Sequence, residues 1–241
     1  MAQSKVRVFV DQPLGEAQTV AVTADQAHYL FGVMRLSVGD VITVFNGIDG
    51  AWTAEIVDAA KRRGMLACKT QTAPQRMPPD LWLLFAPIKK ARTDFIVEKA
   101  TELGASRICP VQTRFTNSER IRQDRLQAHA IEAAEQCGGT FVPEVSALEK
   151  LDAVLAAWPE DRQLVFCDES LVGTASSLAH VRKAPAAILI GPEGGFSAEE
   201  RARLRAAPFA TSISLGPRIL RADTAAVAAL TLWQTAVGDW V

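Results

Sequence analysis

The chain has 241 residues, of which 49% are hydrophobic and 22% are charged, and its formal net charge at pH 7 is −1. This composition is ordinary for a globular protein of one large or two modest domains, with ample material for a core. The near-zero charge excludes an overall basic signature for nucleic-acid binding, although local basic clusters stay open. No apolar run is long enough to span a membrane and no secretory signal is evident, so we expect a cytoplasmic protein.

The four cysteines, Cys68, Cys109, Cys137 and Cys167, are widely spaced and include no CxxC pair. A disulfide framework or a zinc site would need closer spacing, so we expect neither of these and no metal. Cys109 and Cys167 fall inside apolar runs, where a buried thiol that packs as a small hydrophobic side chain is the expected role. The three histidines are scattered and indicate no catalytic group.

Short strand-like segments dominate residues 1–73. Residues 6–10 (VRVFV) are β-prone, and residues 40–59 hold two β-prone runs joined by a turn with Asn-Gly and Asp-Gly, which is typical of a β-hairpin. A further strand is expected over 64–70, and a helix over 23–36 interrupts the strands. So many short strands with tight turns predict a small β-barrel.

Strands alternate with helices beyond the proline-rich segment TAPQRMPP (72–79), which marks the domain boundary. The helix over 92–104 has an apolar face and ends at a glycine, and Ser197 with Glu200 forms a capping-box pattern at the start of another helix. This alternation predicts an α/β domain over 77–241, with a mostly parallel sheet and helices on both faces. The strands expected are 81–87, 107–111, 163–167, 186–190 and 212–215, and the further helices are 123–139, 198–207 and 224–237.

Two glycine-containing turns near the C-terminus carry the functional argument. Residues 188–200 (ILIGPEGGFSAEE) and 212–226 (SISLGPRILRADTAA) each read as an apolar strand, a Gly-Pro turn and a helix start. Turns that leave the carboxyl ends of strands line the ligand crevice of an open α/β sheet, so both turns predict a small-molecule site. Neither is a P-loop or a GxGxxG dinucleotide fingerprint. For the GPEGG turn alone, a plain loop with helix-capping chemistry is an equally good interpretation.

Two charged residues of these turns, Glu193 and Arg221, are the candidate reacting groups. A surface position is the usual fate of an arginine. Arg218 and Arg221 nevertheless flank a strand-to-helix turn, where ligand contacts concentrate, and Thr224 follows as a candidate helix cap.

Several strings together resemble a known family. GPEGGFSAEE and LGPRILRADTA are similar to the two C-terminal signature loops of the RsmE family, the 16S ribosomal RNA uridine N3-methyltransferases of the SPOUT superfamily. KKARTDFIVEKATELGASRICPV and AIEAAEQCGGTFVPEV resemble the first strand–helix–strand unit and the second helix of its catalytic domain. HYLFGVMRLSVGDVITVFNG resembles its N-terminal PUA-like domain, so the resemblance covers nearly the whole chain in order.

The resemblance implies a PUA-like β-barrel over residues 1–73 that holds RNA, and a SPOUT domain over 77–241 with a trefoil knot. It implies S-adenosylmethionine (SAM) as the cofactor and 16S rRNA of the small ribosomal subunit as the partner. It also implies a homodimer through the final helix, although periodicity alone assigns that helix to the core of one chain. The residues of this helix in question are Leu230, Leu232, Trp233 and Trp240.

The resemblance also implies roles for individual residues. Uracil N3 must lose a proton before it attacks a methyl group, and a guanidinium from Arg221 would stabilise the charge that spreads onto O2 and O4. Glu193 either accepts this proton or holds the turn, and the structural role is favoured because a carboxylate base needs a raised pKa. The implied cofactor-binding residues are Leu189, Gly191, Glu193, Gly194, Gly195, Leu215, Gly216, Ile219, Leu220 and Arg221, with Phe166 or Asp168 as a further candidate.

Basic residues are the candidates for RNA contacts, since phosphates dominate the affinity of RNA-binding surfaces. For any one of them, a solvated surface position is the equal alternative. The candidates are Arg7, Arg35, Lys89, Arg92 and Arg114.

The chain departs from the family pattern at Gly139, where arginine is common, at Asp223, where glutamate is usual, and at Phe31 and Gly32. None of these lies in the proposed SAM loops, so we expect the reaction to be kept and RNA affinity to differ in detail. Three alternatives stay open. They are a SPOUT enzyme that methylates a ribose 2′-hydroxyl, a ribosome-assembly protein without catalysis, and a nucleotide-binding hydrolase, which ranks last because the chain has no P-loop.

Overall fold

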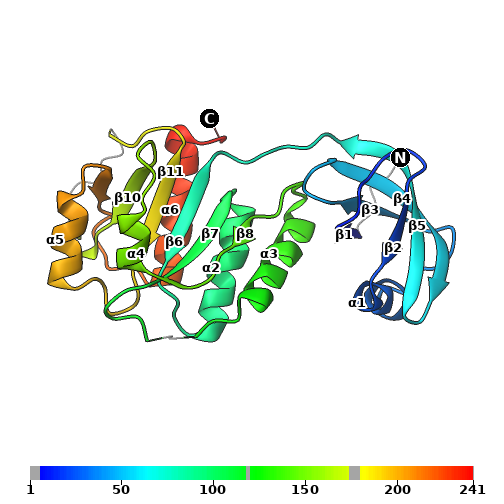
Figure 1. The fold of residues 1–241 in the computed structure, drawn as a ribbon, viewed down its shortest axis with the longest axis horizontal. Helices are drawn as coiled ribbons and strands as arrows, with labels where there is room; N and C mark the ends of the chain where they lie inside the picture. The colour runs from blue at the N-terminus through cyan, green and yellow to red at the C-terminus, as the bar shows by residue number, and fades with distance from the viewer. Residues whose placement is uncertain (1–5, 118–119, 174–179, 241) are drawn as a thin grey trace. The chain divides into compact units, whose positions relative to one another are not determined.

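The computed structural model describes residues 6–117, 120–173 and 180–240. The chain divides into two compact units, whose elements are labelled in Figure 1. The first unit holds the described residues up to Met77 together with Ala134–Val142, and the second holds Pro78–Ala133 and the described residues from Pro143 onward. Each unit buries its own hydrophobic core.

The first unit is built on a five-stranded sheet in the order β1-β3-β4-β5-β2. β1 runs parallel to β3, and the other neighbours are antiparallel. Among the described residues the edge strands β1 and β2 do not pair with each other, so the expected small barrel is an open sheet in its hydrogen bonding. These edge strands have only three and four residues, and short edges are a common way for a sheet to end. The bounds are β1 Arg7–Phe9, β2 Thr19–Val22, β3 Val41–Phe45, β4 Ala51–Ala60 and β5 Arg63–Ala73.

The segment expected as one helix over 23–36 is instead a short α-helix followed by a π-helix. The α-helix, α1 (Ala24–Ala27), begins at a capping box, and the π-helix, η1 (His28–Val33), continues directly from it. Arg35 then has φ +58, a left-handed conformation that L side chains rarely adopt, and the helical path ends there. The local backbone therefore cuts short a helix that the apolar pattern alone would extend.

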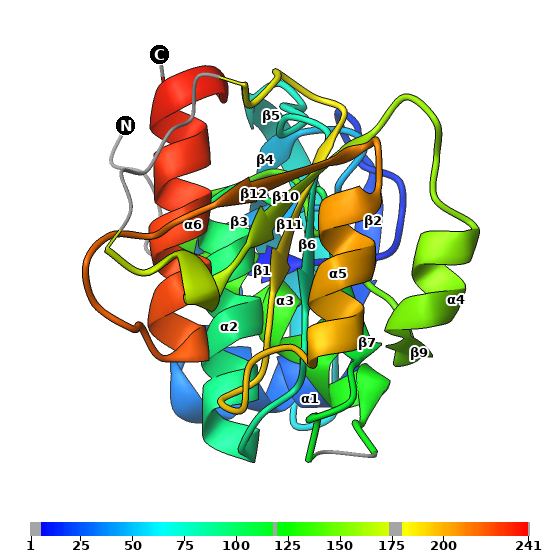
Figure 2. The same ribbon diagram turned by 90° about the vertical axis from the view of Figure 1, so that its left-hand side faces the viewer.

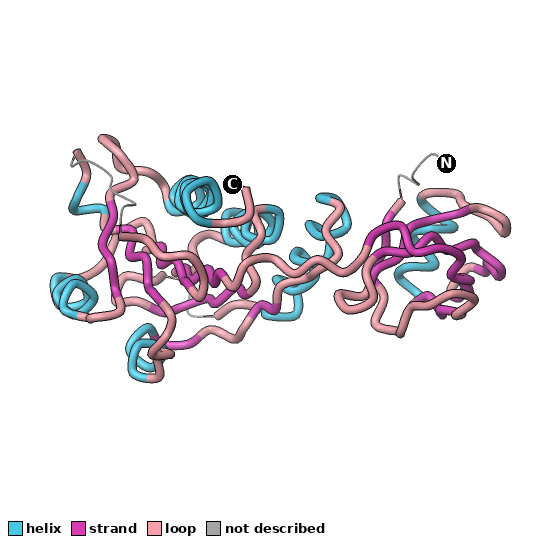
Figure 3. Tube along the Cα trace, turned by 90° about the horizontal axis from the view of Figure 1, so that it is seen from above, coloured by secondary structure: helices cyan, strands magenta, loops and turns pink. Residues whose placement is uncertain are grey.

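The second unit is a seven-stranded parallel sheet in the order β12-β10-β11-β6-β7-β8, with β9 paired to β7. Helices α2, α3 and α6 lie on one face, and α4 and α5 lie on the other (Figure 2). Figure 3 shows helices on both sides of this sheet. Because both faces are covered, the central strands β10 and β11 are buried along their whole length. The α/β alternation expected from the sequence is confirmed. The strand bounds are β6 Leu81–Phe85, β7 Arg107–Gln112, β8 Glu144–Val145, β9 Glu149–Lys150, β10 Gln163–Cys167, β11 Ala186–Ile190 and β12 Ala210–Ile213. The helix bounds are α2 Lys90–Glu102, α3 Gln123–Cys137, α4 Leu151–Ala156, α5 Ala198–Ala206 and α6 Ala222–Val237.

The end of α3 and the residues after it, Ala134–Val142, belong to the first unit although the chain has already entered the second. The backbone N–H of Phe9 donates to Glu135 Oε1 at 2.8 Å, and Arg7 Nη2 donates to Gly139 O at 2.7 Å. The predicted division at residues 73–77 follows the order of the sequence. It therefore did not anticipate a segment that returns to complete the first unit.

Helix α6 supplies part of the core of the second unit. Leu230 and Trp233, which the sequence placed among the candidates for a partner interface, are buried within the chain. Leu232 is half-buried, and Trp240 is 51% exposed. The apolar face of the helix thus packs on its own unit, as its periodicity alone indicated. Among the described residues, no helix is long and apolar enough to cross a lipid bilayer.

Candidate functional site

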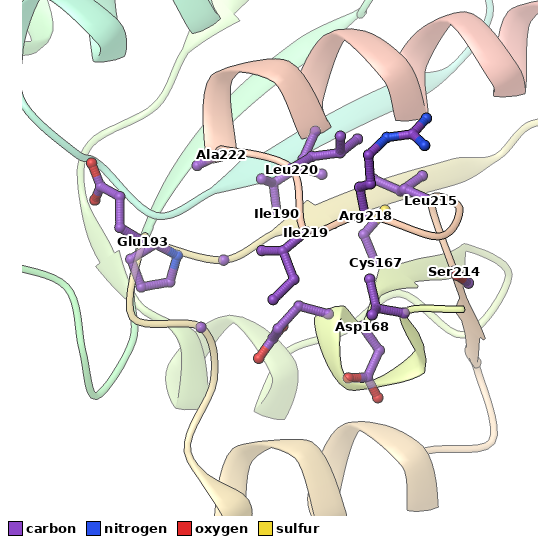
Figure 4. A pocket seen from close by; sticks show the side chains of 16 residues that line it. Cys167, Asp168, Ile190, Glu193, Ser214, Leu215, Arg218, Ile219, Leu220 and Ala222 are labelled. Atoms are coloured by element: carbon purple, nitrogen blue, oxygen red, sulfur yellow. The ribbon is translucent and has the colours of Figure 1, made fainter. Parts of the chain in front are cut away.

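Three neighbouring strands of the second unit end at the same edge of its sheet. β10 lies between β12 and β11, and all three run parallel, so the loops that follow them meet. These loops line one pocket, shown in Figure 4, with residues drawn from 167–172, 190–195 and 214–225. The pocket therefore lies where the two glycine turns predicted a ligand site.

The loop after β11, residues 191–197, is closely packed, and its backbone requires glycine at two positions. A Cβ on Gly191 would lie 2.7 Å from the ring of Phe196, which is fully buried. Gly195 has φ +67, and its N–H donates to Pro192 O at 2.9 Å, which closes the turn. The capping box predicted at the start of α5 is present and fixes the end of this loop.

The loop after β12, residues 214–221, is more open. Ile219 is 76% exposed at the pocket wall. Gly216 has φ +105, and a Cβ there would meet no atom within 4 Å. The hydrogen bonds of this glycine are all long: its N–H donates to Ser214 Oγ at 3.3 Å, and its carbonyl accepts from the Ser214 hydroxyl at 3.4 Å and from the backbone N–H of Gly173 at 3.3 Å.

Most of the residues implied for cofactor binding line this pocket, namely Gly191, Glu193, Gly195, Leu215, Ile219 and Leu220. Leu189 does not, because its side chain packs in the core with Phe166 and Leu204. Side chains alternate along a strand, so the next residue, Ile190, reaches the pocket instead. The other residues outside the lining are Gly194, Gly216 and Arg221.

Of the two arginines that flank the second loop, the sequence favoured Arg221 for the site, whereas the structure brings Arg218 to the pocket. Arg218 lines the pocket, and Arg221 does not. Arg221 is instead the exposed N-cap residue of α6, so Thr224 lies inside the first turn of the helix and does not cap it. In the part of the chain that the structure describes, neither arginine side chain makes a hydrogen bond or an ion pair. Figure 4 shows Arg218 and Glu193 on opposite sides of the pocket.

Two carboxylates at the end of β10 are held by one face of α5. Asp168, whose side chain is fully buried, accepts from Arg205 Nε at 2.9 Å and Nη2 at 2.5 Å. Glu169 Oε1 accepts from Arg201 Nη1 at 2.5 Å and from the backbone N–H of Phe196 at 3.2 Å. Since both carboxylates line the pocket, α5 fixes one wall of the site. Sequence reasoning named Asp168 only as a further candidate and missed Glu169 and its arginine partner.

Cys167 is the one thiol in the pocket lining. Burial raises its pKa from the ordinary value of 9.0 to about 12, so the thiol is neutral at physiological pH. A neutral thiol is a poor nucleophile, which makes Cys167 a packing residue. Among the described residues, no group of three His, Cys, Asp or Glu side chains could hold a metal ion.

Arg7, a candidate for RNA contact, is occupied within the first unit. Besides its hydrogen bond to Gly139 O, its guanidinium lies 5.0 Å from the centre of the Phe45 ring. Burial lowers the pKa of Arg7 below its usual value. Because its guanidinium already contacts Gly139 and Phe45, Arg7 is no longer a candidate for RNA contact.

The other basic candidates are more available. Arg35, Lys89 and Arg114 are exposed, and Arg92 Nε lies 3.7 Å from Asp223 Oδ2 in a half-exposed ion pair. Asp223 is a position where the chain departs from the family pattern. Its carboxylate therefore ties the start of α6 to the first turn of α2.

Comparisons with known proteins agree with this architecture. The model of an RNA methyltransferase domain matches residues 75–234, and that of an RNA methyltransferase PUA domain matches residues 22–64. The chain is 31% identical to the ribosomal RNA small subunit methyltransferase E of Rickettsia conorii over 231 residues, which cover 93% of each chain. It is 33% identical to the protein of the same name from Synechocystis over 223 residues, which cover 88% of this chain and 71% of the relative.

Solved structures show the same fold. A ribosomal RNA small subunit methyltransferase E from Neisseria gonorrhoeae, bound to S-adenosyl methionine, superposes with a TM-score of 0.88 at 28% identity and covers 98% of this chain and 99% of its own. A putative methyltransferase from Legionella pneumophila in complex with SAM gives the same TM-score and identity, with 99% and 100% covered. On sequence and on fold, the chain belongs to the family of the ribosomal RNA small subunit methyltransferases E.

Proposed function

We propose that this protein transfers a methyl group from SAM to N3 of a specific uridine in 16S rRNA of the small ribosomal subunit. The observation that carries the proposal is the pocket between the two glycine loops, in a chain that superposes over its length on a SAM-bound relative. We place the reaction in the cytoplasm, with the first unit holding the RNA around the target.

The residues of the pocket fit the proposed cofactor. Ile190, Leu215 and Leu220 offer an apolar wall for an adenine ring, and the glycine loop lets backbone approach the ligand. Glu169 offers its Oε2, which no described hydrogen bond uses, to the hydroxyls or the positive charge of the cofactor, whereas the buried Asp168 carboxylate is occupied by Arg205 and Ser170 and shapes the wall. We assign cofactor binding to these residues and to the other residues that line the pocket, apart from Arg218, to which we give a role on the substrate below.

Residues that do not bind the cofactor act on the uracil, whose N3 is the nucleophile. SAM, when bound, supplies a methyl group on a positively charged sulfur. The N3–H of uracil loses its proton, the lone pair of N3 forms the new bond to the methyl carbon, and the C–S bond breaks to leave S-adenosylhomocysteine. Arg221 remains our candidate for stabilising the charge on O2 and O4, and Arg218 joins it as a second candidate because it lines the pocket. Both guanidiniums are free to pair with substrate in the described part of the chain.

Glu193 is our candidate proton acceptor. The turn that contains it is closed by backbone atoms, through Gly195 N–H and Pro192 O, and no described hydrogen bond uses the Glu193 carboxylate. The structural role favoured from the sequence therefore has no contact to support it. An exposed carboxylate at the rim of the pocket can pass the proton to water.

Two finer features belong to the proposal. We propose that the loops after β11 and β12 form part of a trefoil knot, and that the enzyme is a homodimer. Leu232 of α6 and Trp240, which lies beyond the end of that helix, remain candidates for the dimer interface, since Leu230 and Trp233 are buried in the chain. Sedimentation of the purified protein tests the dimer. A monomer at micromolar concentration contradicts it.

The test of the function is methyl transfer from labelled SAM to small ribosomal subunits from a strain that lacks this gene. Nucleoside analysis should find the label in 3-methyluridine. Label in a 2′-O-methyl nucleoside keeps the pocket and assigns a different nucleophile. No SAM binding at all contradicts the enzyme and favours an assembly protein.

Substitution of the two arginines tests their roles. We expect Arg221→Ala to lower kcat by about 100-fold or more, because it removes a charge that acts mainly in the transition state. Arg218→Ala should show which of the two guanidiniums carries this effect. Full turnover of Arg221→Lys would show that a bidentate planar cation is not needed at this position.

A further inference from the structure

An exposed phenylalanine stands against the first glycine loop. Phe115, in the loop between β7 and α3, is 44% exposed. A Cβ on Gly194 would lie 3.1 Å from Phe115 Cβ and 3.6 Å from Cγ, which is tighter than most real Cβ contacts, so the glycine lets the phenylalanine lie close against this loop. β6 lies between β7 and β11 and runs parallel to both, which brings the two loops to the same edge of the sheet (Figure 2). Gly194 sits between two residues of the pocket lining, so Phe115 flanks the mouth of the pocket.

The turn that carries Phe115 is tightly hydrogen-bonded. Thr113 N–H donates to Thr116 Oγ1 at 2.9 Å, the two hydroxyls lie 2.9 Å apart, and Thr116 N–H donates back to Thr113 O at 3.2 Å. Thr113 is buried, so the base of the turn is anchored in the unit. The ring is therefore presented by a defined backbone.

One buried carboxylate joins this turn to the glycine loop. Glu200 is 7% exposed, and its Oε1 accepts from the backbone N–H of Arg114 at 2.8 Å. Its Oε2 accepts from the backbone N–H of Ser197, also at 2.8 Å. Glu200 thus completes the capping box of α5 and sets the distance between the two loops with the same side chain.

A base that reacts with a buried methyl donor must leave its stack, and enzymes that extrude bases hold them against aromatic or apolar side chains. Large apolar side chains are usually buried, so an exposed ring held rigidly beside a ligand pocket is the surface that such a base needs. The neighbouring Arg114 side chain is exposed and positively charged, which suits the phosphate of the same nucleotide.

We propose that Phe115 is the platform on which the extruded target uracil stacks, and that Glu200 is a positioning residue that holds this platform against the glycine loop. The inference rests on the proposed function. It adds a substrate-binding residue outside the two signature loops. It separates the nucleobase of the RNA, at Phe115, from the adenine of the cofactor, inside the pocket.

The test compares Phe115→Ala, Phe115→Leu and Phe115→Trp. Stacking of one base on an aromatic ring contributes about 1–3 kcal/mol, so kcat/KM for small subunits should fall by roughly ten-fold or more in the Ala and Leu variants. The Trp variant should retain it, and the Kd for SAM should stay within about two-fold in all three. If the Leu variant is as active as the wild type, the base packs on any apolar side chain at this position and the stacking proposal is wrong. If Ala weakens SAM binding instead, the ring holds the cofactor.

A second readout needs no turnover. Subunits reconstituted with 16S rRNA that contains 4-thiouridine should cross-link to Phe115 under long-wavelength light, with the modified peptide identified by mass spectrometry. If the wild-type protein methylates no uridine, the proposed function fails, and the cross-link still decides whether a base contacts the ring. Absence of the cross-link in the active wild-type enzyme would overturn the inference alone.

Glu200→Gln tests the positioning role against Glu199→Gln, a neighbouring exposed carboxylate on the same helical turn. Glu200→Gln should weaken the Phe115 cross-link and raise KM for subunits by several-fold, while the Kd for SAM is kept. Glu199→Gln should behave as wild type. Equal effects of the two variants, or a loss of SAM affinity that accompanies the loss of cross-link, would assign Glu200 to general folding of the site.

Discussion

The two loops that line the pocket differ in how they are held. In the loop after β11, the buried ring of Phe196 meets Gly191, and Glu169 accepts the Phe196 N–H. In the loop after β12, Ile219 projects with 76% of its surface exposed, and Gly216 has open space around the position of a Cβ. One side of the site is built before any ligand arrives, and the other keeps room to adapt.

This difference separates two ways in which a residue can matter to the site. Residues of the rigid loop contribute to the free energy of folding, because their contacts are already made. Residues of the open loop contribute to binding, because their partners are in the ligand. Substitutions in the two loops should therefore divide between stability and affinity. The predictions below run from the largest expected effect on stability to the smallest.

Gly191→Ala should have the largest effect. The new methyl group must displace the ring of Phe196, which packs edge-on against Phe166 with the ring centres 5.0 Å apart. Overpacking of this kind costs about 1–3 kcal/mol of unfolding free energy, measured by urea denaturation. The matched control is the same substitution in a Phe196→Leu background, where the smaller side chain leaves room. If the two changes are simply additive, the contact does not limit this position.

Glu169→Ala should lower the free energy of unfolding by about 1 kcal/mol. It removes the acceptor of the Phe196 N–H and the partner of Arg201, but both members of the ion pair are partly exposed, which limits its contribution. Affinity for SAM should fall as well, because the rigid loop loses its tie to the end of β10. Glu160→Ala, which removes an exposed carboxylate outside the pocket, is the control for the change in net charge. Equal melting curves for the two variants would contradict a held loop.

Ile219→Ala should leave the unfolding free energy within about 0.5 kcal/mol of wild type, since little of the side chain is buried in the protein. Its affinity for SAM should nevertheless fall by roughly ten-fold, because the ligand supplies the missing apolar contact. Isothermal titration and denaturation on the same preparation check both parts. A large loss of stability with unchanged affinity would reverse the assignment of the two loops.

Local patterns in the sequence predicted the main strands and helices and the location of the pocket. Apolar runs marked the central strands, and the pair Ser197 and Glu200 marked the start of α5. Glycine and proline after two of these strands located both loops. Each of these signals depends on residues within a few positions of one another, which is why they could be read without a structure.

Features that depend on distant residues were not accessible in this way. The choice between Leu189 and Ile190 as a pocket residue depends on which face of the sheet each side chain takes, and neighbouring apolar residues look alike. The ion pairs of Asp168 and Glu169 join positions 37 and 32 residues away on α5. The contact of Phe9 with Glu135 spans 126 positions and adds a late segment to the first unit. Each of these features depends on packing between residues that are far apart in the sequence.

The thiol of Cys167, at the end of the strand between the two loops, should have the smallest effect on stability near neutral pH. Burial raises its pKa to about 12. The thiol therefore stays protonated at pH 7–9, and alkylation should accelerate only as the pH approaches that value. Iodoacetamide at pH 8 should modify the exposed Cys137 and leave Cys167 unmodified, as counted by mass spectrometry of the digested protein.

The sign for stability follows from the same pKa. Above about pH 9 the unfolded thiol ionises while the native thiol does not, so the unfolded state binds fewer protons and the free energy of unfolding falls with rising pH. Cys167→Ala should flatten that alkaline decline. If Cys167 is alkylated slowly at pH 8 and SAM suppresses the reaction, the open loop exposes the strand end by moving. Rapid alkylation that SAM does not affect would show that neither loop covers the thiol. It would contradict the distinction between a rigid loop after β11 and an open loop after β12.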